Sequence, residues 1–105
     1  EQAKRLLFLD ELWVADRALD AGLVSEVCAD DQLLSVVGEL AARLATGPTF
    51  AFAQTKKLMR EGADRSLSEQ LQAELAAGLL CGRSEDGNEA LRAAVEKRPP
   101  RFIGR

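Results

Sequence analysis

The sequence predicts a mainly α-helical fold of about six helices with one short strand. Over most of the 105 residues, apolar side chains recur at the spacing of an α-helix. Ser, Asp, Gly and Pro lie where the predicted helices begin and end. One stretch, residues 23–28, alternates in the manner of a strand. The sequence lacks the regular succession of strands and helices that marks a complete α/β enzyme, so we expect a helical layer.

Two short helices are expected at the beginning of the chain, over residues 2–12 and 14–21. Both segments place apolar residues at helical spacing beside charged ones. Gly22 follows the second helix at the position of a left-handed C-terminal cap. After the strand-like stretch, Asp30 and Asp31 are expected to cap the next helix through their side chains.

The third and fourth helices are expected between Asp31 and Gly62. The third carries an apolar stripe at helical spacing, formed by Leu33, Val36, Val37, Leu40 and Leu44. It ends near Gly47, and Pro48 then suits the first turn of the fourth helix, because no backbone donor is needed there. The fourth helix is predicted to end at Glu61.

The last two helices present more apolar surface than they can cover for one another. Ser66 and Glu69 have the spacing of a capping box ahead of the fifth helix. Ser84 opens the sixth, which carries Lys97-Arg98 in its last turn and ends at Pro99-Pro100, because proline cannot continue a helix. The apolar residues in question are Leu67, Leu71, Leu75, Leu79, Leu91, Val95, Phe102 and Ile103. Surplus apolar surface of this kind predicts an interface.

Charge and composition exclude several kinds of function. A net charge of −3 disfavours nucleic-acid binding, which needs a basic surface, and no apolar run approaches the roughly 18 residues that span a bilayer. The chain has no histidine, so it cannot form a Ser-His-Asp triad or a histidine metal site. Cys28 and Cys81 are too far apart for a zinc motif and are expected to be reduced thiols. We therefore expect a cytoplasmic protein with no metal site and no nucleic-acid or membrane partner.

Several short motifs follow one another along the whole chain. They are Gly22-Leu23-Val24, Gly47-Pro48 with Lys56, Ser66 with Glu69, Ser84-Glu85-Asp86 with Glu89, and Glu96-Lys97-Arg98-Pro99-Pro100-Arg101-Phe102. This ordered set resembles the last third of the crotonase (enoyl-CoA hydratase/isomerase) superfamily, whereas each piece alone is unspecific. The sequence departs from the family pattern at Leu9-Asp10 and Val14, where a Thr-Gly pair and a helix-capping residue are usual. Ala90 and Ala94 replace a glycine and an aromatic residue.

The resemblance implies a crotonase-type α/β spiral fold, of which this chain forms the C-terminal helical layer. Residues 1–28 would be the end of the spiral core, and residues 29–105 the helical lid and oligomerisation region. The parent enzyme would act on acyl-CoA thioesters, by hydration or by a double-bond shift through an enolate stabilised in an oxyanion hole. It would assemble as a homotrimer or hexamer. Hydrolases, dehalogenases and decarboxylases belong to the same superfamily, so the reaction subtype stays open.

No catalytic residue is expected in this chain, because the resemblance places the oxyanion hole and the catalytic carboxylates in an upstream portion of the protein. Since the chain starts with Glu1 rather than methionine, we expect it to be a segment of such a protein and inactive alone. The early acidic residues Glu1, Asp10, Glu11, Asp16 and Asp20 are interpreted as charges on helix surfaces. The alternative is a non-catalytic helical module of the same descent that serves oligomerisation or partner binding.

Two lysines are candidate ligand contacts. The resemblance implies that Lys97 reaches the phosphate or adenine end of coenzyme A, which enters as part of the substrate, with no separate cofactor. An ammonium on a flexible stem suits a polyphosphate, but a lysine at the end of a helix needs no ligand. Ala94 also removes the aromatic ring that would stack on the adenine. Lys56 is the second candidate, and Arg98 and Arg101 are expected to form surface ion pairs or contacts between subunits.

Overall fold

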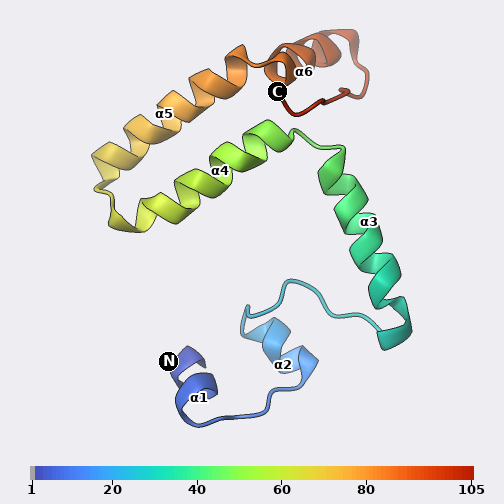
Figure 1. The fold of residues 1–105 in the computed structure, drawn as a ribbon, viewed down its shortest axis with the longest axis vertical. Helices are drawn as coiled ribbons and strands as arrows, with labels where there is room; N and C mark the ends of the chain where they lie inside the picture. The colour runs from blue at the N-terminus through green and yellow to red at the C-terminus, as the bar shows by residue number, and fades with distance from the viewer. Residues whose placement is uncertain (1) are drawn as a thin grey trace. The chain divides into compact units, whose positions relative to one another are not determined.

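The computed structural model describes residues 2–105, which form six α-helices and two short 3₁₀ segments (Figure 1). The helices are α1 (Gln2–Phe8), α2 (Ala15–Asp20), α3 (Leu33–Ala45), α4 (Thr49–Glu61), α5 (Leu67–Arg83) and α6 (Glu85–Glu96), and the 3₁₀ segments are Asp30–Gln32 and Gly62–Asp64. The predicted mainly helical class is confirmed. The chain divides into two compact units, Glu1–Gly38 and Glu39–Arg105. The functions assigned to residues 1–28 and 29–105 remain predictions.

Residues 23–28 do not form the predicted strand, and no strand is present anywhere in residues 2–105. A strand needs the backbone of a neighbouring strand as its hydrogen-bonding partner. Here the N–H groups of Leu23 and Val24 donate instead to the carbonyl of Ala18, at 2.8 and 3.4 Å, and close the end of α2. An alternating sequence alone cannot supply the missing partner strand.

The ends of the first two helices are decided by single residues. α1 ends at Phe8 rather than near residue 12, and Asp10 then has a left-handed backbone with φ 50°, which a right-handed helix cannot contain. α2 begins after Val14, which offers no side-chain cap. Gly22 has φ 71°, so the predicted left-handed position after α2 is confirmed.

Asp30 and Asp31 do not occupy the predicted capping position. They lie inside the first turn of the 3₁₀ segment, whose N-cap residue is Ala29 and makes no side-chain hydrogen bond. Their negative charges still suit the positive end of the helix dipole. Pro48 is the N-cap of α4 rather than part of its first turn, and Gly62 ends α4 as predicted.

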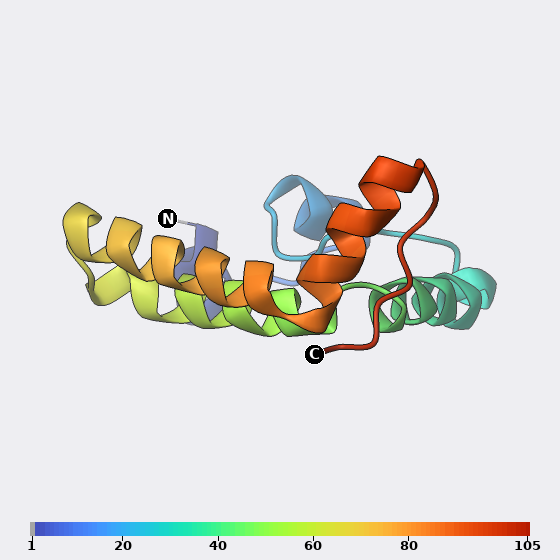
Figure 2. The same cartoon turned by 90° about the horizontal axis from the view of Figure 1, so that it is seen from above.

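In the second unit, α4 and α5 lie side by side, and α6 follows α5 at an angle (Figures 1 and 2). Small residues of α5, Ala73, Ala76 and Ala77, line a shallow recess of about 300 Å³ against α4. Small side chains allow two helices to approach closely. The leucine row of α5 is exposed instead, as Leu67, Leu71, Leu75 and Leu79. The leucine face of α5 is therefore available to contact another protein surface.

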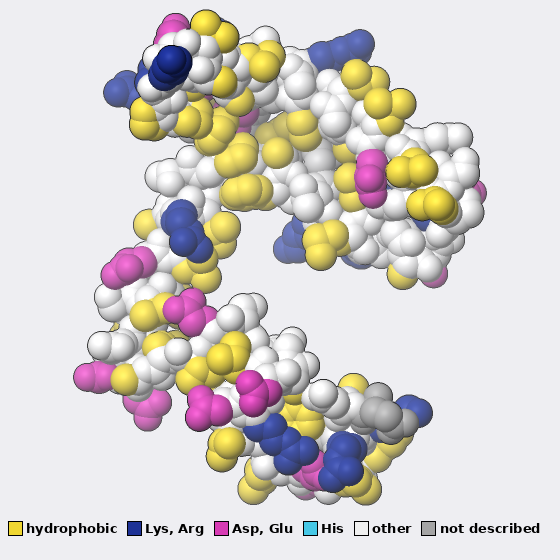
Figure 3. Space-filling model, turned by 180° about the vertical axis from the view of Figure 1, so that it is seen from behind, with side chains coloured by type: hydrophobic (Ala, Val, Ile, Leu, Met, Phe, Trp, Pro, Cys, Tyr) yellow, Lys and Arg dark blue, Asp and Glu magenta, His cyan; other side chains and the backbone are white. Residues whose placement is uncertain are grey.

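Few hydrophobic side chains are buried. Among the described residues, Ala18 and Ala93 are the buried hydrophobic ones, and large side chains such as Leu12, Leu34 and Val95 are exposed. Figure 3 shows hydrophobic side chains at many places on the face that it draws. Burial of apolar surface is the main stabilising contribution in folded proteins. These faces therefore need cover from elsewhere. No helix within residues 2–105 has both the length and the apolar character that crossing a membrane requires.

The predicted capping box at the start of α5 is confirmed. Ser66 Oγ accepts the N–H of Glu69 at 3.3 Å, and the Glu69 carboxylate accepts the N–H of Ser66 at 2.8 Å. These bonds occupy donors that have no partner inside the helix. The hydrogen bonds from Ser66 lower the pKa of Glu69.

In the full-length protein, replacing Ser66 by alanine is expected to lower the free energy of unfolding by about 1 kcal/mol, because the Glu69 N–H loses its acceptor. Ser68→Ala is the matched control, since Ser68 is exposed on α5 and lies outside the capping box. Chemical denaturation of both variants beside the parent protein measures the difference. Equal effects of the two substitutions would show that the capping box does not stabilise α5.

Candidate functional site

Asp86, in the first turn of α6, binds the C-terminal tail, residues 99–105. Its carboxylate, in a residue that is 4% exposed, accepts the N–H of Ile103 at 2.7 Å and the N–H of Gly104 at 3.0 Å. The N–H of Asp86 itself donates to the carbonyl of Arg105 at 2.8 Å. The tail therefore returns along α6 to the beginning of that helix.

Glu89 holds the start of the tail from the same helix. Arg98 donates two parallel hydrogen bonds to its carboxylate, from Nη1 to Oε1 at 2.5 Å and from Nη2 to Oε2 at 3.0 Å. The N–H of Arg101 donates to Oε1 at 2.9 Å. Arg98 Nε also pairs with Glu96 at 2.5 Å. We refer to Asp86, Glu89 and Arg98 as the tail clasp.

The ion pair of the tail clasp stays charged at neutral pH. The hydrogen bond from Arg98, followed by that from the N–H of Arg101, lowers the pKa of Glu89 from 4.5 to about 2. The same pairing, with Glu96 as the second partner, raises the pKa of Arg98. Because the pKa of Glu89 is depressed in the folded chain, its stabilising contribution is complete above pH 4.5 and is lost as the pH falls through about 2.

Lys97 lies just beyond α6 rather than in its last turn, where the sequence analysis placed it. Its backbone is left-handed, with φ 54° and ψ 41°. The N–H of Lys97 donates to the carbonyl of Ala94 at 3.3 Å, and the N–H of Arg98 to that of Ala93 at 3.0 Å. This is the hydrogen-bond pattern of a Schellman motif, in which glycine usually holds the left-handed position. A residue with a Cβ atom costs about 1 kcal/mol more there.

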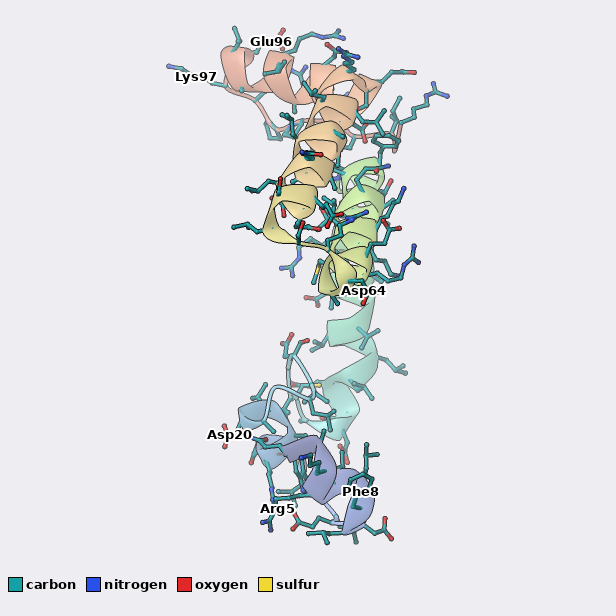
Figure 4. The ribbon with its side chains drawn as sticks, turned by 90° about the vertical axis from the view of Figure 1, so that its left-hand side faces the viewer. Arg5, Phe8, Asp20, Asp64, Glu96 and Lys97 are labelled. Carbon is teal, nitrogen blue, oxygen red and sulfur yellow. The ribbon has the colours of Figure 1, made fainter. Side chains whose placement is uncertain are left out.

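The two adjacent cations, Lys97 and Arg98, differ in what they bind. Arg98 is occupied by Glu89 and Glu96. The Lys97 side chain is exposed, extends outward from the end of α6 (Figure 4), and has no acceptor among residues 2–105. Arg98 is therefore a structural residue, whereas the Lys97 ammonium remains available to an anion from outside.

Lys56, the other candidate, lies in the middle of α4 and is exposed. Its side chain has no ion pair within the described part of the chain. Within the described residues, the side-chain hydrogen-bond partners of Asp86, Glu89 and Arg98 lie on α6 or in the chain that follows it, so Lys56 is not part of the tail clasp. Its backbone is ordinary helix, and its exposed neighbour Lys57, rather than Lys56, lines the recess between α4 and α5.

Glu11, between α1 and α2, is a structural carboxylate. It accepts hydrogen bonds from Arg5 Nη2 at 2.5 Å, Trp13 Nε1 at 3.2 Å and Arg17 Nη2 at 2.9 Å. The Arg17 guanidinium also lies 4.6 Å from the centre of the Trp13 ring. These partners, Arg5 first, lower the pKa of Glu11. A carboxylate held in its ionised form is a poor proton donor near neutral pH.

The other early acidic residues are not gathered into a site. Asp16 and Asp20 are exposed on α2, Asp10 follows α1, and Glu1 lies outside the described residues. Within residues 2–105, no cluster of His, Cys, Asp or Glu side chains is arranged to hold a metal ion.

The sequence predicted a surface ion pair for Arg98, which is confirmed, but it did not predict the partner Glu89 or the rest of the tail clasp. Asp86 and Glu89 were recognised there as motif residues without a physical role. A three-residue spacing places two carboxylates on the same face of a helix, and Pro99-Pro100 directs the chain out of that helix. Together these features could have indicated that the tail returns to the acidic face.

The whole chain, residues 1–105, matches the sequence model of the Enoyl-CoA hydratase/isomerase family. It is 33% identical to 1,2-epoxyphenylacetyl-CoA isomerase of Escherichia coli, over 99% of this chain and 40% of that protein. It is 31% identical to crotonyl-CoA hydratase of Syntrophomonas wolfei, over 98% of this chain and 40% of that protein. The chain thus spans about 40% of the length of these curated relatives.

Solved structures show the same likeness in three dimensions. An enoyl-CoA hydratase from Polaromonas superposes with a TM-score of 0.90 at 30% identity, over 97% of this chain and 40% of that one. A Pseudomonas aeruginosa structure is 70% identical over 70% of this chain and 32% of that one, with a TM-score of 0.65.

Proposed function

Because the chain belongs to the enoyl-CoA hydratase/isomerase family, we propose that it is the C-terminal segment of an enzyme that acts on acyl-CoA thioesters. The full-length enzyme hydrates a 2-enoyl-CoA or shifts its double bond through an enolate, whose charge two backbone N–H donors stabilise. The carboxylates that move the proton belong to the part that precedes this chain. This part would account for the remainder of the length of the curated relatives.

The role we propose for this segment is to close the site and to build a homotrimer or hexamer in the cytoplasm. The exposed leucine row of α5 and the scarcity of buried apolar side chains support this role. Large exposed apolar surfaces mark places where other protein surface is bound. The upstream part of the same protein and neighbouring subunits are the partners that such an enzyme provides.

The contact with substrate that we propose is made by Lys97, toward the phosphate groups of coenzyme A. The observation that carries this proposal is an unpaired ammonium at a left-handed backbone position that glycine would occupy at lower cost. Residues with a strained backbone cluster at active sites and at sites that hold ligands. Lys56 is also exposed, but its backbone is helical and unstrained. We therefore propose it only as the second candidate contact.

Two substitutions of Lys97 separate its effect on stability from its effect on substrate binding. Lys97→Gly in the full-length enzyme is expected to increase stability by about 1 kcal/mol, because it relieves the left-handed strain. It should also raise the KM for the CoA thioester about fivefold with kcat unchanged, as expected when uniform binding is lost. Lys97→Ala should raise KM equally without the gain in stability.

Thermal unfolding and steady-state kinetics of the same preparations measure both effects. An unchanged KM in both variants would remove Lys97 from the substrate site. Equal melting temperatures of the glycine and alanine variants would show that the left-handed position is not strained.

A further inference from the structure

We propose that Glu89, acting through Arg98, is a positioning residue that holds the Lys97 ammonium ready for the phosphate groups of the substrate. This inference rests on the function proposed above for Lys97. It adds that the carboxylate of Glu89, which does not touch the ligand, is part of the apparatus that recognises it.

The backbone of Lys97 is left-handed, with φ 54°. A left-handed residue with a Cβ atom is not held by its own preference, so neighbouring contacts must hold it. Two hydrogen bonds to the end of α6 close the turn, one from Lys97 and one from Arg98. The second of these bonds depends on where Arg98 lies.

Arg98 is held in place by Glu89. Its guanidinium binds Glu89 through two parallel hydrogen bonds, and the geometry of such a pair restricts both position and orientation. Glu89 also accepts the N–H of Arg101, on the far side of Pro99-Pro100. One carboxylate therefore holds the chain at two points just after Lys97. The two prolines between these points restrict the backbone further.

Glu96 is the carboxylate next to Lys97 in sequence. It is engaged by Nε of Arg98 at 2.5 Å, while the other two nitrogens of Arg98 engage Glu89. Arg98, held by Glu89, thus keeps Glu96 from neutralising Lys97. Without Glu89, Arg98 loses the two parallel hydrogen bonds that fix its guanidinium, and its bond to Glu96 no longer holds Glu96 in one place.

The test uses the full-length enzyme and a pair of substrates. One is the CoA thioester, and the other is the matching pantetheine thioester, which lacks the nucleotide and its phosphates. Glu89→Gln keeps the size of the side chain and removes its charge, and Arg98→Lys keeps the charge and removes the two-point geometry. Glu74→Gln is the control, because Glu74 is exposed on α5 and lies outside the clasp.

Glu89→Gln and Arg98→Lys are each expected to raise the KM for the CoA thioester about threefold, with kcat unchanged and with no change for the pantetheine thioester. The double variant Glu89→Gln/Lys97→Ala should be no worse than Lys97→Ala alone, because Glu89 acts through Lys97. Glu74→Gln should match the parent enzyme with both substrates.

Two results would overturn the inference while leaving the role of Lys97 intact. One is a substrate-specific effect of Lys97→Ala with none from Glu89→Gln or Arg98→Lys. The other is an effect of the clasp variants that is equal for both thioesters or additive with Lys97→Ala, which would show general structural support. If Lys97→Ala changes neither KM, the proposed contact and this inference both fail.

Discussion

In the full-length enzyme, replacing Gly87 by alanine is expected to lower the free energy of unfolding by about 3 kcal/mol. A Cβ atom at Gly87 would lie 2.2 Å from the carbonyl oxygen of Cys81 and 3.0 Å from the backbone of Gly82. Both neighbours are backbone atoms at the end of α5, so neither can move aside as a flexible side chain could. The junction that turns α5 into α6, and with it the tail clasp, has to open.

Gly78→Ala is the matched control for this substitution. Gly78 lies in the middle of α5, and a Cβ atom there meets nothing within 4 Å. Alanine is favoured over glycine inside a helix by about 1 kcal/mol, so this variant should be more stable than the parent. Chemical denaturation of the two variants compares the same chemical change at two sites. If both substitutions changed the free energy of unfolding in the same direction, Gly87 would not be in close contact with the backbone of Cys81 and Gly82.

The isolated 105-residue chain is expected to show no cooperative thermal unfolding and no hydration of crotonyl-CoA. Its buried hydrophobic residues, within residues 2–105, are Ala18 and Ala93, which is too little apolar burial to offset the loss of chain entropy. We propose that the oxyanion hole and the catalytic carboxylates belong to the upstream part. The helices should persist as fluctuating structure with exposed apolar faces.

Circular dichroism during heating, binding of an apolar dye and a crotonyl-CoA hydration assay check this second prediction. The full-length enzyme is the control for all three. A sharp melting transition of the isolated chain would show that it is a self-contained module, which was the alternative function considered from the sequence. Hydration activity in the isolated chain would contradict the assignment of chemistry to the upstream part.

The longer helices could be predicted from the sequence because local residues decide them. The capping box of Ser66 and Glu69 and the left-handed Gly22 were both identified correctly, since each depends on neighbours within a few positions. The strand at residues 23–28 was wrong, because a strand depends on a partner segment that local sequence does not reveal. Asp30 and Asp31 were displaced from the cap by a 3₁₀ segment that begins after Ala29.

The candidate site was predictable only in part. Lys97 was named from a resemblance, and the sequence placed it in ordinary helix, where a lysine needs no ligand. The structure adds the left-handed backbone and the absence of an acceptor within residues 2–105, which are the features that make the lysine unusual. The ion pair of Glu89 and Arg98 joins residues nine positions apart after a chain reversal, so helical spacing could not reveal it.

The tail clasp also gives a physical meaning to the motif that first suggested the family. Asp86 and Glu89 bind the backbone of the tail through three N–H groups, and Arg98 adds the charged pair. These residues hold the end of the chain against α6. In the same arrangement the Lys97 side chain points outward from the end of α6.

The most direct test is a crystal structure of the full-length enzyme with a bound CoA thioester, in which the distance from Lys97 Nζ to the nearest phosphate oxygen is measured. Our account predicts a charge-assisted contact of about 2.8 Å, or of about 4 Å as an ion pair, with the tail clasp intact and every group at the thioester carbonyl supplied from outside these 105 residues. A carboxylate of this chain at the reacting carbonyl, or phosphates bound elsewhere with Lys97 in solvent, would contradict it.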